Sequence, residues 1–182
     1  MKDRNFAVFC CLYTFYLQNI DKQLFRWEEL MRFYIKYENT AFYGSPQYFL
    51  DDESFFYDPW NDTDFSIYIG DSYLSLDIIL KSGEVKQFSG FSPRNNWIER
   101  SLSVPNYRFG SLYVCMDTET EPGVGIRYSG NFKCFFDRQS GTLCIGNPDD
   151  LLNCESVKFA QNSVAAIRDG KLISVWIKPV FK

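Results

Sequence analysis

The sequence predicts an α+β domain in which an N-terminal helix packs on a mainly antiparallel β-sheet, with strands filling the C-terminal two-thirds. Apolar residues recur at helical spacing over 21–39, and polar and apolar residues alternate from residue 65 onward. The sequence lacks the β–α–β alternation that would predict a parallel sheet. At 182 residues the chain fits a single domain. We divide it into a strand plus helix (1–43), an acidic-aromatic loop region (44–64) and an antiparallel β region (65–182).

An apolar run, 6–17, follows Lys2 and Arg4 at the start of the chain. Its length suits the core of a signal peptide, but it is too short to span a bilayer and no small-residue cleavage site follows. We therefore expect a first strand over 6–16, with a cleaved signal as the alternative. Without an export signal we expect a cytoplasmic protein that contacts no membrane, which agrees with unpaired cysteines.

The predicted helix begins at Asp21, whose side chain can cap it. Its apolar face consists of side chains three or four residues apart: Leu24, Trp27, Met31, Tyr34 and Tyr37. Charged residues lie largely on the opposite face. Gly44 and Pro46 follow, so we expect the helix to end near Asn39.

Prolines and frequent Asp and Asn residues predict loops over 44–64. Beyond them, alternation and turn residues predict five strands, and Pro93 precedes a short helix or turn. The predicted strands are 65–69, 74–80, 85–88, 108–116 and 126–128, and the helix or turn is 97–102.

A hairpin is expected at 137–142, with Gly141 in the left-handed conformation. Its register pairs Asp137 with Thr142 and Phe135 with Cys144. Cys134 and Cys144 then lie on opposite faces of the sheet, which disfavours a disulfide between them.

Asp169-Gly170 predicts the last hairpin. It pairs Ile167 with Leu172, and further along it pairs Ala165 with Ser174 and Ser163 with Trp176. Both faces of this hairpin are rich in apolar residues, so we expect it to lie centrally in the sheet.

The composition argues against most catalytic chemistry. The chain has no histidine, which removes imidazole-based triads and histidine-containing metal sites. None of its six cysteines forms a C-x-x-C pair, so they are interpreted as buried thiols. No phosphate-binding glycine motif and no basic cluster occurs, which argues against nucleic acid. We expect a non-enzymatic protein with no catalytic residue, cofactor or metal.

The segment 37–80 holds nine carboxylates, no lysine or arginine, and twelve aromatic residues. The remaining chain carries fourteen acids and nineteen bases, so the net charge of −4 hides a segment of −9. Disordered acidic segments are poor in aromatics, so this one indicates a folded, acidic face for a basic protein partner. The predicted contact residues are Asp51, Asp52, Glu53, Phe55, Phe56, Tyr57, Asp58, Trp60, Asp62 and Asp64.

The same segment permits other interpretations. It is an ordinary acidic loop if its aromatic residues fill the core. Residues 62–73 begin like a calcium loop, but Ile67 replaces the turn glycine and Tyr73 replaces the bidentate glutamate. Carboxylates beside aromatics also suit a carbohydrate-binding or carbohydrate-processing domain. A structural subunit that assembles with itself is a further alternative, and the sequence does not decide self-association.

The stretch 159–164, continuing through Asp169-Gly170-Lys171-Leu172 to Trp176, resembles sheets of the immunity proteins of bacterial toxin–immunity systems, such as contact-dependent growth inhibition. The small, acidic, aromatic-rich chain is similar to that class in general character. The resemblance implies a cytoplasmic inhibitor that binds a cognate toxin domain, often over a basic active site. It transfers no catalytic residue to this chain.

Overall fold

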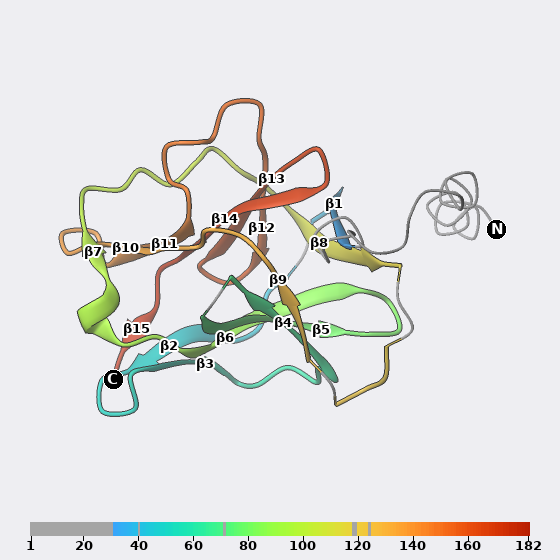
Figure 1. Cartoon of the computed structure of the whole chain (residues 1–182), viewed down its shortest axis with the longest axis horizontal. Coiled ribbons are helices and arrows are strands. Elements are labelled where there is room, and N and C mark those ends of the chain that lie inside the picture. Colours follow the sequence, from blue (N-terminus) through green and yellow to red (C-terminus); the bar gives the residue numbers. More distant parts are fainter. Residues whose placement is uncertain (1–30, 40, 71, 118–119, 124) are drawn as a thin grey trace.

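The computed structural model describes residues 31–182 except 40, 71, 118–119 and 124, and the regular secondary structure of this part of the chain is almost wholly β-strand (Figure 1). It contains fifteen strands and one 3₁₀ turn, Arg94–Asn96. The expected α+β class is therefore wrong. The first strand expected over 6–16 and the first half of the expected helix lie outside the described residues.

The strands occupy the following ranges: β1 Met31–Tyr37, β2 Ser45–Phe49, β3 Ser54–Asp58, β4 Phe65–Ile69, β5 Tyr73–Ile79, β6 Glu84–Phe91, β7 Ile98–Glu99, β8 Arg108–Met116, β9 Gly125–Tyr128, β10 Cys134–Asp137, β11 Thr142–Gly146, β12 Glu155–Ala160, β13 Ser163–Arg168, β14 Lys171–Ile177 and β15 Val180–Phe181.

The strands form one curled, mixed sheet. Its main path runs β15-β2-β3-β6-β8-β12-β13-β14-β11-β10-β7, while β5, β4 and β9 continue from β6, and β1 pairs with β8. The pairs β2–β15, β4–β9, β7–β10 and β8–β12 are parallel. The expectation of a mainly antiparallel sheet is corrected accordingly.

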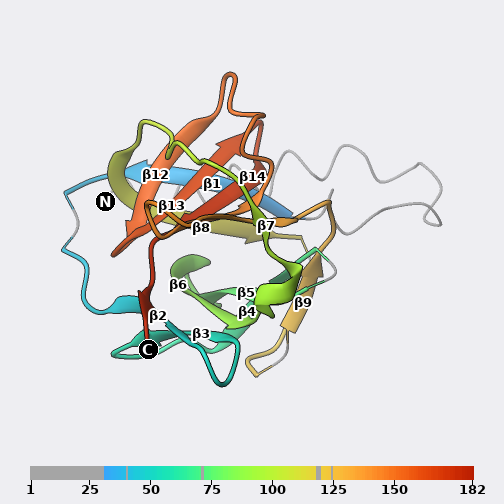
Figure 2. The same ribbon diagram turned by 90° about the vertical axis from the view of Figure 1, so that its left-hand side faces the viewer.

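The sheet curls because β6 and β8 each change partners along their length. One end of β6 pairs with β3 and the other end with β8, which in turn passes to β12. Figure 2 shows the result as two layers, with β2–β6 and β9 below and β1, β8 and β12–β14 above. The core lies between the layers and includes Ile67, Leu76 and Phe88 from below and Val157 and Val175 from above.

Strand β1 replaces the second half of the expected helix. The spacing of Met31, Tyr34 and Tyr37 fits a helical face, but Met31 and Phe33 also alternate with Arg32 and Tyr34 at the period of a strand. The strand period applies, because Met31 and Phe33 are buried while Arg32 and Tyr34 are exposed. All seven residues of β1 pair with β8, so tertiary pairing decides between two periods that the sequence permits equally.

Strands β2 and β3 replace part of the loop expected over 44–64. They form an antiparallel hairpin from the Ser45–Asp58 pair to the Phe49–Ser54 pair. Alternate residues of β3 are buried, which is the pattern of a strand that covers a core. The prolines that indicated loops lie near the start of β2 and just beyond the end of β3.

The hairpin expected at 137–142 is confirmed. Asp137 pairs with Thr142, Phe135 pairs with Cys144, and Gly141 has a φ of 69°. Cys134 packs on the main core, whereas Cys144 belongs to a second apolar cluster, and both thiols are free. The predicted opposite orientation of the two cysteines is therefore correct.

The last hairpin is confirmed in position, with its register corrected. Ile167 pairs with Leu172 as expected, but a bulge follows and shifts the remaining pairs by one residue, so that Val164 pairs with Trp176. The hairpin is central, since β13 lies between β12 and β14. Its second apolar face is covered too, because Val164 and Trp176 pack beneath Leu102 and Leu151.

Among the described residues, no helix has both the length and the apolar character that crossing a membrane requires.

Candidate binding face

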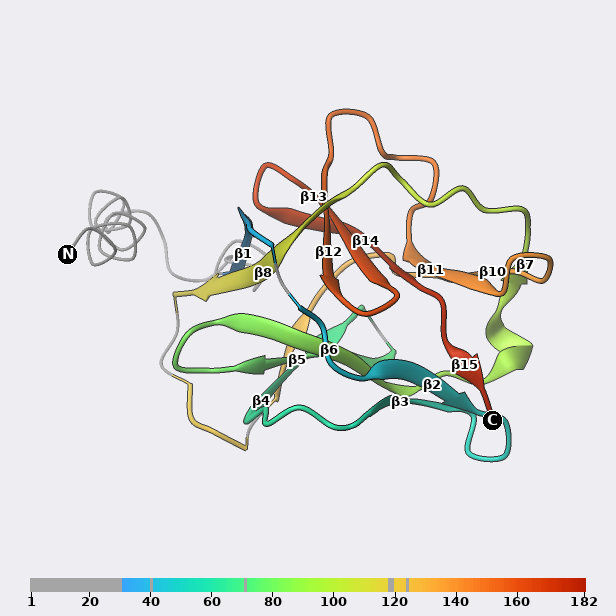
Figure 3. The ribbon, with the colours of Figure 1, turned by 180° about the vertical axis from the view of Figure 1, so that it is seen from behind.

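Strands β2, β3, β6 and β5 are neighbours in the lower layer (Figure 3), and three of them contribute an aromatic residue to one row across the sheet. Phe49 of β2 pairs with Ser54 of β3, and Ser54 pairs with Phe91 of β6. Phe91 in turn pairs with Tyr73 of β5. Paired residues share a face of the sheet, and the residue beside each of them in β2, β3 and β5 is buried in the core. This aromatic row, Phe49, Ser54, Phe91 and Tyr73, therefore points away from the core.

Two further aromatic side chains extend the row into a larger surface. Phe56 lies two residues beyond Ser54 in β3, and its ring meets that of Phe49 edge-on with centroids 5.4 Å apart. Trp60 follows in the loop after β3. These side chains are substantially exposed: 43% for Phe56, 54% for Trp60, 44% for Phe91 and 67% for Tyr73. We call this surface, with the carboxylates beside it, the outer face.

The structure divides the predicted aromatic contact residues into two pairs. Phe56 and Trp60 lie on the outer face. Phe55 and Tyr57 are 1% and 3% exposed and fill the core instead. Because β3 alternates, consecutive aromatics cannot all serve one surface. Burial raises the pKa of Tyr57, whose hydroxyl accepts a hydrogen bond from the backbone N–H of Gln161.

The predicted carboxylates fall into two groups at opposite ends of the outer face. Asp51, Asp52 and Glu53 occupy the β2–β3 turn, beside the aromatic row. Asp51 and Asp52 are exposed, while Glu53 accepts a hydrogen bond from the backbone N–H of Arg94 at 3.1 Å. Glu53 is thereby partly committed to the fold.

The second group follows β3. Asp58 is exposed and accepts a hydrogen bond of 2.8 Å from the Gln47 side chain, and Asp64 accepts one of 2.7 Å from the backbone N–H of Leu80. Asp62 is exposed. In the described part of the chain, none of the six predicted carboxylates forms an ion pair.

A buried carboxylate anchors the loop that carries Trp60. Asp77 of β5 is 2% exposed and accepts hydrogen bonds from the hydroxyls of Ser66, Ser75 and Ser89 and from the Gln87 side chain. Gln87 in turn accepts hydrogen bonds from the backbone N–H of Asn61 at 2.9 Å and from its side chain at 3.0 Å. The network holds Asn61, the residue after Trp60, against the sheet.

Sequence reasoning missed three members of the face and this network. Phe49 and Tyr73 lie in the acidic segment but were not separated from its core aromatics, and Phe91 lies outside the segment. If β2 and β3 had been recognised as strands, their alternation would have separated the exposed aromatic residues from the buried ones. The partners of Asp77 come from three strands, so no local pattern groups them.

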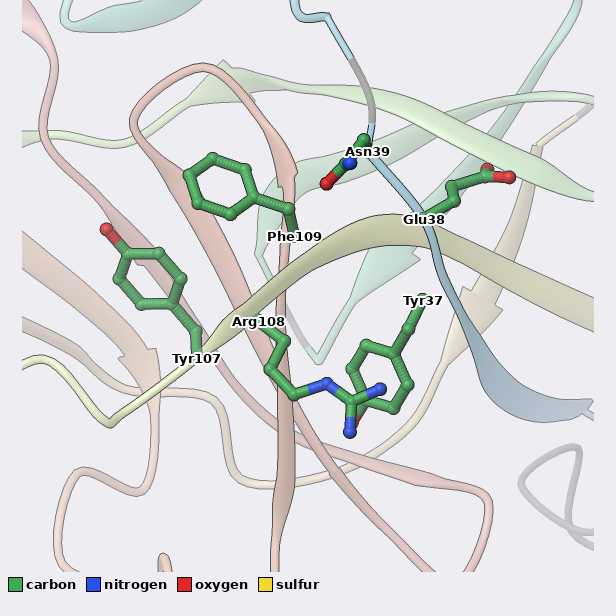
Figure 4. A pocket seen from close by; sticks show the side chains of 6 residues that line it. All are labelled: Tyr37, Glu38, Asn39, Tyr107, Arg108 and Phe109. Atoms are coloured by element: carbon green, nitrogen blue, oxygen red, sulfur yellow. The ribbon is translucent and has the colours of Figure 1, made fainter.

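An open hollow of about 500 Å³ lies on the other layer, where β1 and β8 diverge (Figure 4). Tyr37, Glu38, Asn39, Tyr107, Arg108 and Phe109 line it. The guanidinium of Arg108 lies 3.4 Å from the ring centroid of Tyr37. Burial is the main cause that raises the pKa of the Tyr37 hydroxyl. The hydrogen bond that this hydroxyl donates to Glu155 raises the pKa further. Tyr107 and Phe109 are 42% and 50% exposed.

Three of the described cysteines, Cys134, Cys144 and Cys154, are poorly suited to nucleophilic chemistry. Burial raises the pKa of Cys134 to about 12, and it also raises the pKa of Cys144 and Cys154. These thiols are neutral at ordinary pH, and the thiolate is the reactive form. Within the described residues, no three Asp, Glu or Cys side chains are grouped so as to hold a metal ion.

Comparison with known proteins adds no family to this description: no protein-family profile matches the chain, and no curated protein is significantly similar to it.

Proposed function

We propose that this protein is a non-enzymatic binding protein that docks a basic protein partner on its outer face, and that it serves as a cytoplasmic immunity protein that neutralises a cognate toxin. The observation that carries the proposal is the combination of exposed aromatic side chains with carboxylates that form no ion pair with any residue that the structure describes. Aromatic anchors and complementary charge are the features that give protein interfaces their affinity and their association rate.

The two kinds of side chain have separate roles in this proposal. The exposed carboxylates Asp51, Asp52 and Asp62 attract a cationic surface and speed association, an effect that salt screens over about 8 Å at physiological ionic strength. The rings of Phe56, Trp60 and Phe91 are desolvated on contact and slow dissociation. A toxin whose active site is basic offers the complementary surface, and covering that site blocks its activity.

The test first captures the partner from a lysate of the native host on the immobilised protein. The captured partner is then expressed and purified, and its binding kinetics are measured. The double variant Asp51→Asn/Asp52→Asn should reduce the association rate at low salt by about tenfold and flatten its salt dependence. The matched control is Glu155→Gln/Asp169→Asn, which removes two exposed charges from β12 and the β13–β14 turn of the upper layer.

The toxin assignment needs its own readout. Expression of the captured partner should arrest growth of a test strain, and co-expression of this protein should restore it. A partner that binds equally well to both double variants would show that the outer face is not the docking surface. A partner without toxicity would retain the binding function and refute the immunity role.

The hollow at Arg108 supports a second candidate, carbohydrate binding. Exposed rings of Tyr107 and Phe109 beside the amide of Asn39 and the carboxylate of Glu38 are the groups that stack on sugars and hydrogen-bond their hydroxyls. A glycan array should then show hits that the variant Tyr107→Ala/Phe109→Ala loses and Phe56→Ala retains. An array without hits removes this candidate.

A further inference from the structure

We propose that the anchor of the partner on the outer face is an arginine side chain that lies over Ser54, with its guanidinium against the rings of Phe56 and Phe91. The inference rests on the proposed function, because it names the chemistry that the same face recognises. It goes beyond that function in assigning the recognition to one position and one residue type.

The register of the aromatic row creates the position. Ser54 has the smallest side chain in the row, and its direct neighbours across β2 and β6 are Phe49 and Phe91. Adjacent strands lie about 4.8 Å apart, so the backbones of Phe49 and Phe91 are separated by roughly 10 Å. The short side chain of Ser54 is therefore bordered by Phe49 and Phe91 on the neighbouring strands and by Phe56 two residues along β3.

The rings beside Ser54 have faces available for stacking. Phe56 contacts one ring, that of Phe49, and it does so edge-on. No other aromatic ring in the described part of the chain packs against Phe91. Both side chains are nevertheless more than two-fifths exposed, which is a large apolar area to leave in water.

Charge and shape together favour arginine. Asp51 and Asp52 lie in the turn just before Ser54, are exposed and form no ion pair with the described residues. A guanidinium is planar, stacks on aromatic faces and bonds carboxylates through two parallel N–H groups, whereas an ammonium is a compact, strongly hydrated charge. The same stacking geometry occurs elsewhere in this protein, where the Arg108 guanidinium lies 3.4 Å from the ring centroid of Tyr37.

The experiment compares two synthetic peptides of equal length and charge, with three arginines or three lysines separated by glycines, by ¹H–¹⁵N NMR titration of the full-length protein at low salt. The arginine peptide should bind about five- to tenfold more tightly than the lysine peptide. Its largest shifts should fall on the amides of 49–56 and 90–91.

Filling the position tests it directly. Ser54→Phe keeps every carboxylate and ring but occupies the space, and it should lower the affinity for the arginine peptide to that of the lysine peptide. Ser103→Phe, at an exposed loop residue elsewhere, should change neither. Phe91→Leu removes one stacking face while keeping an apolar side chain. It should also lower the affinity for the arginine peptide, and it replaces Ser54→Phe as the test if that variant does not fold.

The outcomes separate this inference from the proposed function. Equal affinity for the two peptides, with shifts on the outer face, overturns the arginine anchor and leaves the acidic docking face standing. Unchanged binding by both Ser54→Phe and Phe91→Leu also overturns it. If neither peptide shifts any outer-face amide, the anchor and the docking face both fail.

Discussion

Phe55 and Phe56 are adjacent in the chain, yet they point to opposite sides of β3. Phe55 is 1% exposed and packs edge-on against the core ring of Phe88, whereas Phe56 is 43% exposed on the outer face. Strand β3 thus contributes its aromatic residues alternately to the core and to the surface. Its aromatic content therefore reflects two functions, stability and proposed recognition, which strand alternation separates residue by residue.

Phe55→Ala should destabilise the protein by about 3–5 kcal/mol, because it leaves a cavity in the core. Phe56→Ala should cost less than about 1 kcal/mol, because its ring is half in water. Urea unfolding followed by tryptophan fluorescence measures both free energies. Similar losses for the two variants would contradict the orientation of β3.

Asp77 is a buried carboxyl group whose four hydrogen-bond donors are all neutral side chains. Asp77→Ala should lower the free energy of unfolding by about 3 kcal/mol, because it leaves several buried donors without an acceptor. Ser66→Ala removes one hydrogen bond and should cost about 1 kcal/mol. Thermal unfolding of both variants measures the ratio, and an Asp77→Ala variant as stable as the parent would show that the network is dispensable.

Asp137 links stability to pH. Its carboxylate accepts hydrogen bonds from the backbone N–H groups of Leu102, Gln139 and Ser140, and these bonds, that to Leu102 first, hold its pKa below the usual value. A depressed pKa contributes stability above the unfolded-state pKa, roughly 3.9, and that contribution is lost as the pH falls through the folded-state pKa.

Asp137→Asn cannot lose this contribution on acidification, because an amide does not titrate. Its free energy of unfolding should fall less between pH 5 and pH 2.5 than that of the parent. Asp149 and Asp150 also have lowered pKa values from their hydrogen bonds to Arg100 and Arg168, so part of the pH dependence should persist. Parallel pH profiles for parent and variant would exclude Asp137 as a contributor.

At the scale of elements, tight turns decide how closely strands approach. Gly83 and Gly141 have nearly the same backbone conformation, with φ of 71° and 69°. A Cβ atom at Gly141 meets nothing within 4 Å, whereas one at Gly83 lies 2.2 Å from the carbonyl oxygen of Val114. The β5–β6 turn is thus packed against β8, and the backbone N–H of Val114 donates a hydrogen bond to Gly83.

Gly141→Ala should cost only the strain of a left-handed residue, about 1–2 kcal/mol. Gly83→Ala should cost clearly more, because the β5–β6 turn must also move away from β8. Chemical denaturation of the two variants isolates the steric contribution, since the conformational strain is shared. Equal destabilisation would mean that the β5–β6 turn can shift without disturbing the contact between the two layers.

For the whole molecule, the proposed docking face makes a prediction about self-association. Two copies that meet through the same outer face bring like charges together, which is unfavourable at low salt. Sedimentation velocity should therefore find a monomer whose size does not change with concentration. Concentration-dependent growth that Asp51→Asn/Asp52→Asn abolishes would instead favour the self-assembling subunit.

Several local features were predictable from the sequence because neighbours in the chain carry them. The turns at Gly141 and Asp169-Gly170, the alternation of 65–69 and the opposite orientation of Cys134 and Cys144 need only strand geometry and turn chemistry. The concentration of carboxylates on one segment is likewise a property of the sequence alone, as is the absence of histidine.

Pairing between distant strands decided the rest. The residues of β1 satisfy a helical and a strand period, and their partners in β8, more than seventy positions away, select the strand. The aromatic row exists only because β2, β3, β6 and β5 align side by side, and Phe91 joins it from outside the acidic segment. Local sequence records which residues can occupy a face, but which of them share a face depends on long-range hydrogen bonding and on the burial that it permits.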